Sequence, residues 1–292
     1  MEHRELNRDS YYLFDDTMNR KDPIKFLTDK EVSSFDIANE VMFEFQYYNR
    51  KFKEIYLNLE EFETTVLKYS KQIENANQHN VVNDLMNLIY IDVNRTFINF
   101  ITSLKVFIEH IEKRLNRKYG DHSEQFNSFK QLTHNLYENY FAYRFLYYLR
   151  NYSIHDSYPI NNFDKDTELV YDTSQYKSKL HIHFNRDVLL ENEVMKKMEP
   201  DLRRYNNLFP VKNVVDGIHE PLGKLFDGFI RIEEKYFVKH ASIISNIFEE
   251  NTNCKIMSFG KLVDVSGYEY NIETIILPID LAKQILQKFK LI

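Results

Sequence analysis

The segment from Ser34 to Ile73 constrains the fold more than any other part of the chain. Its apolar residues recur at helical spacing, and no proline or glycine interrupts them. This pattern predicts one long helix, broken once at most. A polar connection follows at residues 74–80, and a second apolar pattern predicts a helix that begins near Leu85 and ends near Gly120.

The next segment contains both a helix start signal and a helix stop signal. Asp121 is followed three residues later by Glu124, a spacing that resembles a capping box and predicts the start of a third helix. Tyr158 precedes Pro159, and the residue before a proline is pushed toward extended geometry, so this helix should end at or before Tyr158. Residues 1–160 are therefore expected to form a domain built on a helical bundle.

The chain changes character after Pro159, where short strand-like segments alternate with helical patterns. Residues 161–292 are therefore expected to form a smaller α+β region with a β-hairpin, and the whole chain is expected to be mainly α. The elements expected in this region are strands at residues 168–171 and 179–184, a helix from Pro221 in its first turn to Glu250, a strand at residues 268–276 after a turn at Ser266-Gly267, and a short helix capped by Asp280 and ending near Lys290.

Composition excludes several classes of protein. The 292 residues include 38 Lys+Arg against 44 Asp+Glu, a net charge of −6 that argues against a generally basic nucleic-acid coat. With only 6 Gly, the chain has neither a G-x-G-x-x-G nor a G-x-x-x-x-G-K-[ST] fingerprint for nucleotide phosphates. A single Cys, a start that lacks the apolar region of a signal peptide, and the lack of an apolar run long enough to span a bilayer predict a cytoplasmic protein with no membrane partner.

The sequence RNYSIH at residues 150–155, at the end of the third predicted helix, is the most informative segment for function. Cleavage of RNA without a metal needs a base for the 2′-hydroxyl proton, an acid for the departing 5′-oxygen and a cation for the charge at phosphorus. His155 can serve as base or acid, and the guanidinium fork of Arg150 suits two phosphate oxygens. One imidazole cannot readily fill both proton-transfer roles, so a second copy of the chain is expected to contribute.

An Arg with a polar residue directly after it, and a His after four intervening residues, at the end of a long helix in a helical domain, resembles the signature of the HEPN superfamily. The resemblance rests on Arg150, Asn151 and His155 and covers residues 34–158. It implies a metal-independent endoribonuclease that needs no cofactor, acts on RNA as a homodimer with facing motifs, and leaves a 2′,3′-cyclic phosphate and a 5′-hydroxyl. It assigns catalysis to Arg150 and His155, with Asn151 orienting the imidazole or touching the phosphate. It also implies a toxin or antiviral-defence role with a cognate antitoxin or regulatory partner.

Arg and His are frequent enough in this chain for about one chance match to this spacing. A second match, from Arg117 to His122, straddles Gly120 and lacks the Asn, so we interpret it as the chance match. On an ideal helix Arg150 and His155 lie about 140° apart, so either the Arg side chain reaches round or the helix loosens near His155.

Polar residues recur every four positions on the second predicted helix, at Arg95, Asn99 and Ser103. The functional interpretation is a substrate-binding stripe that faces the motif, with Arg95 and Asn99 as contacts to the RNA backbone; the alternative is an ordinary solvent-exposed face. Residues 94–155 carry nine Lys/Arg against five Asp/Glu, and this local excess permits RNA to approach an otherwise acidic chain.

Other features support weaker hypotheses. His181 and His183 share one face of an expected strand, either as a metal pair or as surface histidines; no third ligand is apparent, so no metal site is expected. Cys254 has no adjacent His or basic cluster, which favours an inert thiol. Two other functions stay open: a helical module that binds a partner or a nucleotide without catalysis, and a structural interaction protein whose residues 168–292 do the binding.

Overall fold

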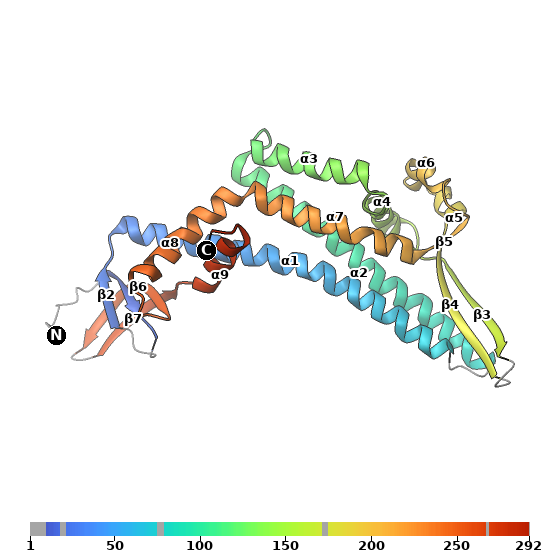
Figure 1. Cartoon of the computed structure of the whole chain (residues 1–292), viewed down its shortest axis with the longest axis horizontal. Coiled ribbons are helices and arrows are strands. Elements are labelled where there is room, and N and C mark those ends of the chain that lie inside the picture. Colours follow the sequence, from blue (N-terminus) through green and yellow to red (C-terminus); the bar gives the residue numbers. More distant parts are fainter. Residues whose placement is uncertain (1–9, 18–21, 75–78, 171–174, 267–268, 292) are drawn as a thin grey trace. The chain divides into compact units, whose positions relative to one another are not determined.

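The chain is mainly α, as predicted (Figure 1). It divides into two compact units, which we call the terminal unit (Met1–Asn49 with Glu233–Ile292) and the central unit (Arg50–Ile232). None of the helices that the structure describes combines the length and the apolar composition needed to cross a membrane. The computed structural model describes residues 10–17, 22–74, 79–170, 175–266 and 269–291.

The first helix, α1 (Asp29–Glu74), is uninterrupted and contributes to both units. It begins earlier than predicted because Thr28 and Glu31 form a capping box. The Glu31 N–H donates to Thr28 Oγ1 at 3.3 Å, and the Thr28 N–H donates to Glu31 Oε2 at 2.9 Å. The hydrogen bond from the Thr28 N–H, followed by that from Lys25, lowers the pKa of Glu31 to about 2.

The central unit combines long helices with a small antiparallel sheet of strand order β3-β4-β5. The third helix (α3) and the fourth (α4) both pack against the second (α2) and the seventh (α7). The elements that follow α1 in this unit are α2 (His79–Tyr119), α3 (Glu124–Asn139), α4 (Phe141–His155), β3 (Asn162–Val170), β4 (Gln175–Asn185), α5 (Arg186–Glu191), a 3-10 helix η1 (Met195–Met198), α6 (Glu199–Leu202), β5 (Leu208–Pro210) and α7 (Val211–Ile232).

Aromatic side chains form much of the core of the central unit. Phe184 of β4 contacts Phe97 of α2, Phe145 of α4 and Phe209 of β5, with centroid separations of 5.9, 5.0 and 5.2 Å. This cluster ties the base of the β3–β4 hairpin to the helices. The predicted domain boundary after residue 160 therefore falls inside one compact unit.

The predicted third helix is two helices, α3 and α4, which meet at Tyr140 in an extended conformation. No proline or glycine is present at the break. Instead, the Arg144 guanidinium donates to the carbonyls of Tyr137 and Glu138 in the last turn of α3, and to Asp201 at 2.9 Å. A side chain of one helix thus caps the carbonyls that the preceding helix leaves unpaired.

The start of α3 also differs from the prediction. Gly120 has a φ of +89° and lies directly after α2, which leaves Asp121 in the turn between the helices. Ser123 is the N-cap of α3, and its Oγ accepts a hydrogen bond from the Phe126 N–H at 3.2 Å. The predicted capping box of Asp121 and Glu124 is therefore wrong, because the N-cap is Ser123, two residues after Asp121.

The predicted helix from Pro221 to Glu250 is likewise two helices, α7 and α8 (Glu234–Glu250), separated at Glu233. Pro221 lies inside α7 rather than in its first turn, because the preceding turns already bury Val214 and Ile218. Proline has no N–H, so one carbonyl of the preceding turn loses its helical donor.

The terminal unit contains a four-stranded antiparallel sheet of strand order β2-β1-β6-β7. Strands β1 and β2 were not predicted, whereas β6 and β7 pair as the predicted hairpin requires; Gly267 of the predicted turn lies outside the described residues. A Cβ on Gly260 of β6 would lie 2.0 Å from the Glu273 carbonyl oxygen, so this close approach of two strands requires glycine. The remaining elements of the unit are β1 (Tyr11–Asp15), β2 (Asp22–Phe26), β6 (Met257–Ser266), β7 (Glu269–Ile276) and α9 (Ile279–Lys288).

The start of α9 and the bounds of β3 and β4 differ from the predictions. Asp280 does not cap α9; Pro278 is the N-cap, and Asp280 lies in the first turn, where a carboxylate suits the helix N-terminus. Strands β3 and β4 are both longer than predicted, although Tyr171 lies outside the described residues, as do residues 75–78 of the predicted polar connection.

Candidate functional site

The RNYSIH motif occupies the last turns of α4, which ends at His155. The helix buries Phe145, Leu149 and Tyr152, whose spacing of three or four residues forms one apolar face. The Asp156 N–H donates to the Tyr152 carbonyl at 2.9 Å and closes the helix, as the following proline predicted. Because the helix stays regular through His155, it does not loosen within the motif.

Arg150 and Asn151 contact each other. Arg150 Nη1 donates to Asn151 Oδ1 at 3.3 Å, and both side chains are half-buried. The Arg150 Nε is buried without a hydrogen-bond partner, and no carboxylate among the described residues pairs with this guanidinium. The guanidinium is therefore contacted by a neutral amide rather than by a carboxylate.

His155 is exposed and lines a shallow hollow of about 430 Å³. The wall consists of residues 153–158 and, from α2, Ile98. The only carboxylate in this wall, Asp156, accepts a hydrogen bond from Asn192 Nδ2 at 2.7 Å. Arg150 and Asn151 are not part of the wall, so within one chain the structure does not bring all three predicted catalytic residues around the same space.

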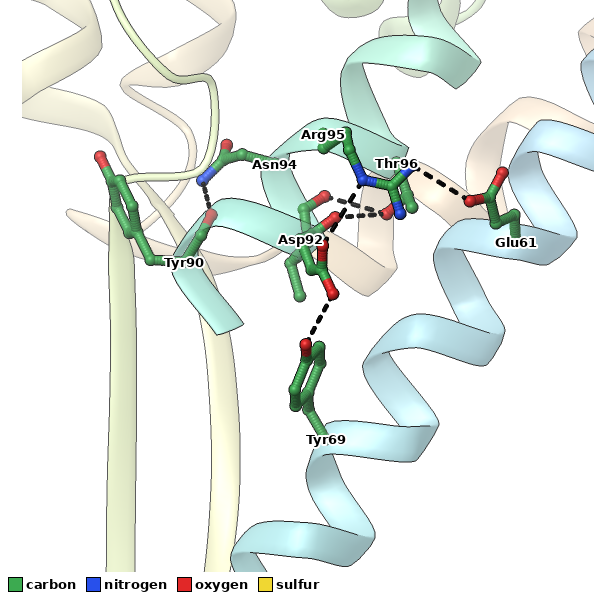
Figure 2. A network of polar contacts seen from close by, with 8 residues as sticks. Glu61, Tyr69, Tyr90, Asp92, Asn94, Arg95 and Thr96 are labelled. Atoms are coloured by element: carbon green, nitrogen blue, oxygen red, sulfur yellow. Dashed lines mark hydrogen bonds and ion pairs between the residues drawn. The ribbon is translucent and has the colours of Figure 1, made fainter. Parts of the chain in front are cut away.

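Asn94 of α2 anchors the segment that follows His155. Its Nδ2 donates to the Ile160 carbonyl and to the Tyr90 carbonyl, and its Oδ1 accepts from the Ile160 N–H, each at 2.9 Å (Figure 2 shows the Tyr90 bond). Asn94 and Ile160 are both fully buried, so one carboxamide satisfies both backbone groups of a residue that water does not reach. The sequence did not lead us to predict this role of Asn94. The signal in the sequence was a polar residue, Asn94, directly after Val93 in the apolar pattern of the helix.

Arg95 points toward α1 and joins a network of charged and polar groups (Figure 2). Its Nη1 lies 3.3 Å from Glu61 Oε1 and its Nε lies 3.5 Å from Asp92 Oδ1. Tyr69 Oη donates to Asp92 Oδ2 at 2.6 Å, and burial together with this hydrogen bond raises the pKa of Tyr69 to about 12. Two carboxylates, Glu61 and Asp92, therefore compensate the Arg95 charge that was predicted to contact a phosphate.

The predicted substrate-binding stripe does not meet the motif within the chain. Neither Arg95 nor Asn99 lines the hollow at His155, although Ile98 of the same helix does. Asn99 is exposed, and the Ser103 hydroxyl donates to the Phe100 carbonyl of its own helix at 2.7 Å.

The second Arg-x4-His match lies in the turn region after α2. The His122 side chain is 97% exposed and lies 3.7 Å from Asp121, while Arg117 is in the last turn of α2. The two residues are thus not held by a common helix, in contrast to Arg150 and His155.

The two histidines of β4 stack against each other, with ring centroids 6.0 Å apart and planes 14° apart. His181 Nε2 lies 3.0 Å from Asp166 Oδ2, whereas His183 Nδ1 is buried without a partner. Among the residues that the structure describes, no cluster of three or more His, Cys, Asp or Glu side chains is arranged to hold a metal ion. Burial and a hydrogen bond to Asp15 raise the pKa of the Cys254 thiol, which keeps it in its less nucleophilic form.

Comparison with known proteins identifies no relative of the chain. No protein-family model, no curated protein and no solved structure matches it. The resemblance to the HEPN superfamily therefore stands on the RNYSIH motif and its helical setting.

Proposed function

We propose that the protein is a metal-independent endoribonuclease of HEPN type that acts in the cytoplasm on single-stranded or loop RNA. The observation that carries this proposal is an exposed imidazole, His155, at a helix end that also carries Arg150, whose guanidinium pairs with no carboxylate among the described residues. A base removes the proton of the ribose 2′-hydroxyl, and the 2′-oxygen attacks phosphorus. The bond from phosphorus to the 5′-oxygen breaks, and an acid protonates that oxygen, which leaves a 2′,3′-cyclic phosphate and a 5′-hydroxyl.

The surroundings of His155 suit a ribose-phosphate backbone. Ser157 and Tyr158 line the hollow together with His155, and the nearby Asp156 carboxylate accepts a hydrogen bond from Asn192. Ser and Tyr side chains are common contacts to the phosphates and sugars of nucleic acids.

Two copies of the chain are part of the proposal. A regular α4 keeps Arg150 and His155 about 140° apart around the helix, so one helix does not present both groups to one phosphate. Acid and base roles also need two imidazoles, and a homodimer with paired α4 ends would supply them.

A second candidate function is an RNA- or partner-binding helical module without catalysis. It is favoured by the position of Arg150, which donates to Asn151 and does not line the hollow at His155. A toxin or antiviral-defence role, with an antitoxin or other regulatory partner, extends the first proposal by analogy with the superfamily.

The two candidates are separated by RNA cleavage in the presence of EDTA. We expect His155→Ala to reduce cleavage by roughly 10²–10⁴-fold, the loss associated with a general acid or base. The matched control is His122→Ala, which removes an exposed His of the chance match and should leave the rate within a few fold. Arg150→Lys keeps the charge but loses the planar fork, so a large loss would indicate that two phosphate oxygens are gripped.

Three results would contradict the proposal. They are strict dependence of cleavage on added Mg²⁺ or Mn²⁺, equal losses from the two His variants, and full activity of a protein that sedimentation shows to be a monomer. RNA binding with no cleavage would favour the non-catalytic module.

A further inference from the structure

A groove of about 500 Å³ lies beside the β3–β4 hairpin, away from the motif of α4. We call it the hairpin groove. It is lined by residues 62–70 of α1, residues 180–183 of β4, and residues 210–216 where β5 passes into α7. Its walls are mostly apolar and include Phe62, Val66, Leu67, Val211 and Val215. Leu67 is 55% exposed, which leaves a large apolar side chain open to a ligand.

The hairpin groove borders the edge of β4 rather than one of its faces. Side chains alternate between the two faces of a strand, yet four successive residues of β4 line the groove. On one side β4 pairs with β3 at residues 175–183; on the other, β5 pairs with it only at residues 183–185. Residues 180–182 therefore have no strand on their outer edge within the described chain, and backbone N–H and C=O groups of alternate residues face that side.

The end of β5 explains why this edge is open. β5 ends at Pro210, opposite His183, and α7 begins at the next residue, Val211, so β5 does not extend the ladder to residues 180–182. His183 Nδ1 is buried without a partner at this point. A hydrogen-bonding group that enters the groove along the β4 edge would reach the place where the ladder stops.

The charges of the hairpin groove favour a basic occupant. Lys212 pairs with Asp216 at 2.9 Å, which leaves Glu63 without an ion pair among the described residues. The hydrogen bond to Asp216 is the main cause of a raised Lys212 pKa, and the charge of Glu63 adds to it. Among the carboxylate and ammonium groups of the lining, the negative charge of Glu63, at the rim, is therefore left without an ion pair within the described chain.

We propose that the hairpin groove binds an extended peptide segment of another protein, which adds to the free edge of β4 as a strand. Backbone hydrogen bonds to residues 180–182 would provide affinity, and apolar side chains at alternate positions would pack on the walls formed by α1 and α7. A Lys or Arg between them would meet Glu63. The helix from Phe62 to Ser70 is about 12 Å long, enough to accompany roughly four residues of a strand.

A phage-displayed library of random eight-residue peptides, selected against the full chain, tests this proposal. We expect enriched sequences to alternate apolar and polar residues and to contain a Lys or Arg. A selected peptide should lose at least tenfold in affinity when the backbone amides of alternate residues are N-methylated, because its side chains stay the same while its donors are removed. Selection against Glu63→Lys should exchange the basic residue for Asp or Glu.

Two matched variants locate the binding site. Leu67→Glu should weaken a selected peptide by about tenfold or more, since it places a charge in the apolar wall. Leu88→Glu is the control, because Leu88 has the same 55% exposure but does not line the groove. Equal effects of the two variants, or no enrichment of alternating sequences, would overturn the proposal.

Two other occupants give distinct outcomes that would also overturn it. If a second copy of this chain fills the groove, Leu67→Glu should convert a dimer into a monomer while no peptide is selected. If the groove takes an apolar small molecule, 8-anilinonaphthalene-1-sulfonate should bind in a manner sensitive to Leu67→Glu while N-methylation of any selected peptide has no effect.

Discussion

The carboxamide of Asn94 offers the sharpest test of how the central unit is held together. Asn94→Ala removes the partners of the Ile160 N–H and C=O, and both groups belong to a fully buried residue. Each buried backbone group left unpaired costs roughly 1–3 kcal/mol, so the pair costs about 4 kcal/mol. The Tyr90 carbonyl also loses a bond, but as a helical residue it keeps its place in the backbone ladder of α2.

This loss in the free energy of unfolding corresponds to a large decrease in the melting temperature. For a unit of this size 1 kcal/mol lowers Tm by roughly 2–4 °C, so Asn94→Ala should lower Tm by roughly 8–16 °C. Circular dichroism at 222 nm measures the transition. Hydrogen exchange read by mass spectrometry should also show faster exchange in the segment around Ile160 than elsewhere in the unit.

The matched control is Asn99→Ala on the same helix. Asn99 is exposed, and its replacement should change stability by no more than about 0.5 kcal/mol. An Asn94→Ala variant that melts within 2 °C of the unaltered protein (about 0.5–1 kcal/mol), or two variants that melt at the same lowered temperature, would show that the carboxamide does not stabilise the segment at Ile160.

Two further predictions concern glycine and charge. Gly223→Ala should stabilise α7 by roughly 0.5–1 kcal/mol because no atom lies within 4 Å of the new Cβ, whereas Gly228→Ala should not, because its Cβ would lie 2.5 Å from Leu132 Cδ2. Thermal melts of both variants, and of Gly228→Ala combined with Leu132→Ala, measure the difference. An equal gain in stability at both sites would contradict the prediction. Glu31→Gln should lower stability at pH 7 by weakening the capping box with Thr28. Because the Glu31 pKa is about 2 in the folded chain against 4.5 normally, the stability advantage of the unaltered protein should be complete above pH 4.5 and should shrink as the pH falls toward 2. A difference in stability that does not change between pH 7 and pH 3 would be the contrary result.

Helical periodicity predicted the long helices well, because each buries a stripe whose spacing is visible in the local sequence. The breaks between helices were not predicted, since they depend on distant groups. At Tyr140 the chain turns without proline or glycine, and Arg144 and Asp201 stabilise the turn from outside α3. The capping box at Thr28 was visible in the sequence, but the apolar pattern placed the helix start after it.

Strands whose partners are distant in the sequence were also not predicted. The hairpin of β6 and β7 was partly predicted, because its two strands are adjacent in the chain. Strand β1 has only five residues and pairs with β6, so nothing in its local sequence identifies its partner.

The candidate site was predictable only as a linear motif. The position of RNYSIH at a helix end was predicted from the proline that follows it, and the structure has α4 end at His155. The surroundings were not predictable in the same way: Arg95 turns to Glu61 on a different helix, and Asn94 reaches Ile160 across a tertiary contact. Such contacts depend on how the helices pack, which periodicity alone does not determine.

The pairing of β1 with β6 sets an order of events during synthesis. Residues 11–15 leave the ribosome before the central unit, yet one of their two partner strands, at residues 257–261, emerges only after the whole central unit has been made. At roughly 5–20 residues per second this delay is on the order of tens of seconds, long enough for the central unit to fold. Throughout that interval Leu13 and Phe14, both fully buried in the finished sheet, lack their cover and are a natural target for chaperones that bind nascent chains. A ribosome that stalls before residue 257 would release a chain with a complete central unit and a first strand whose edge toward β6 is open.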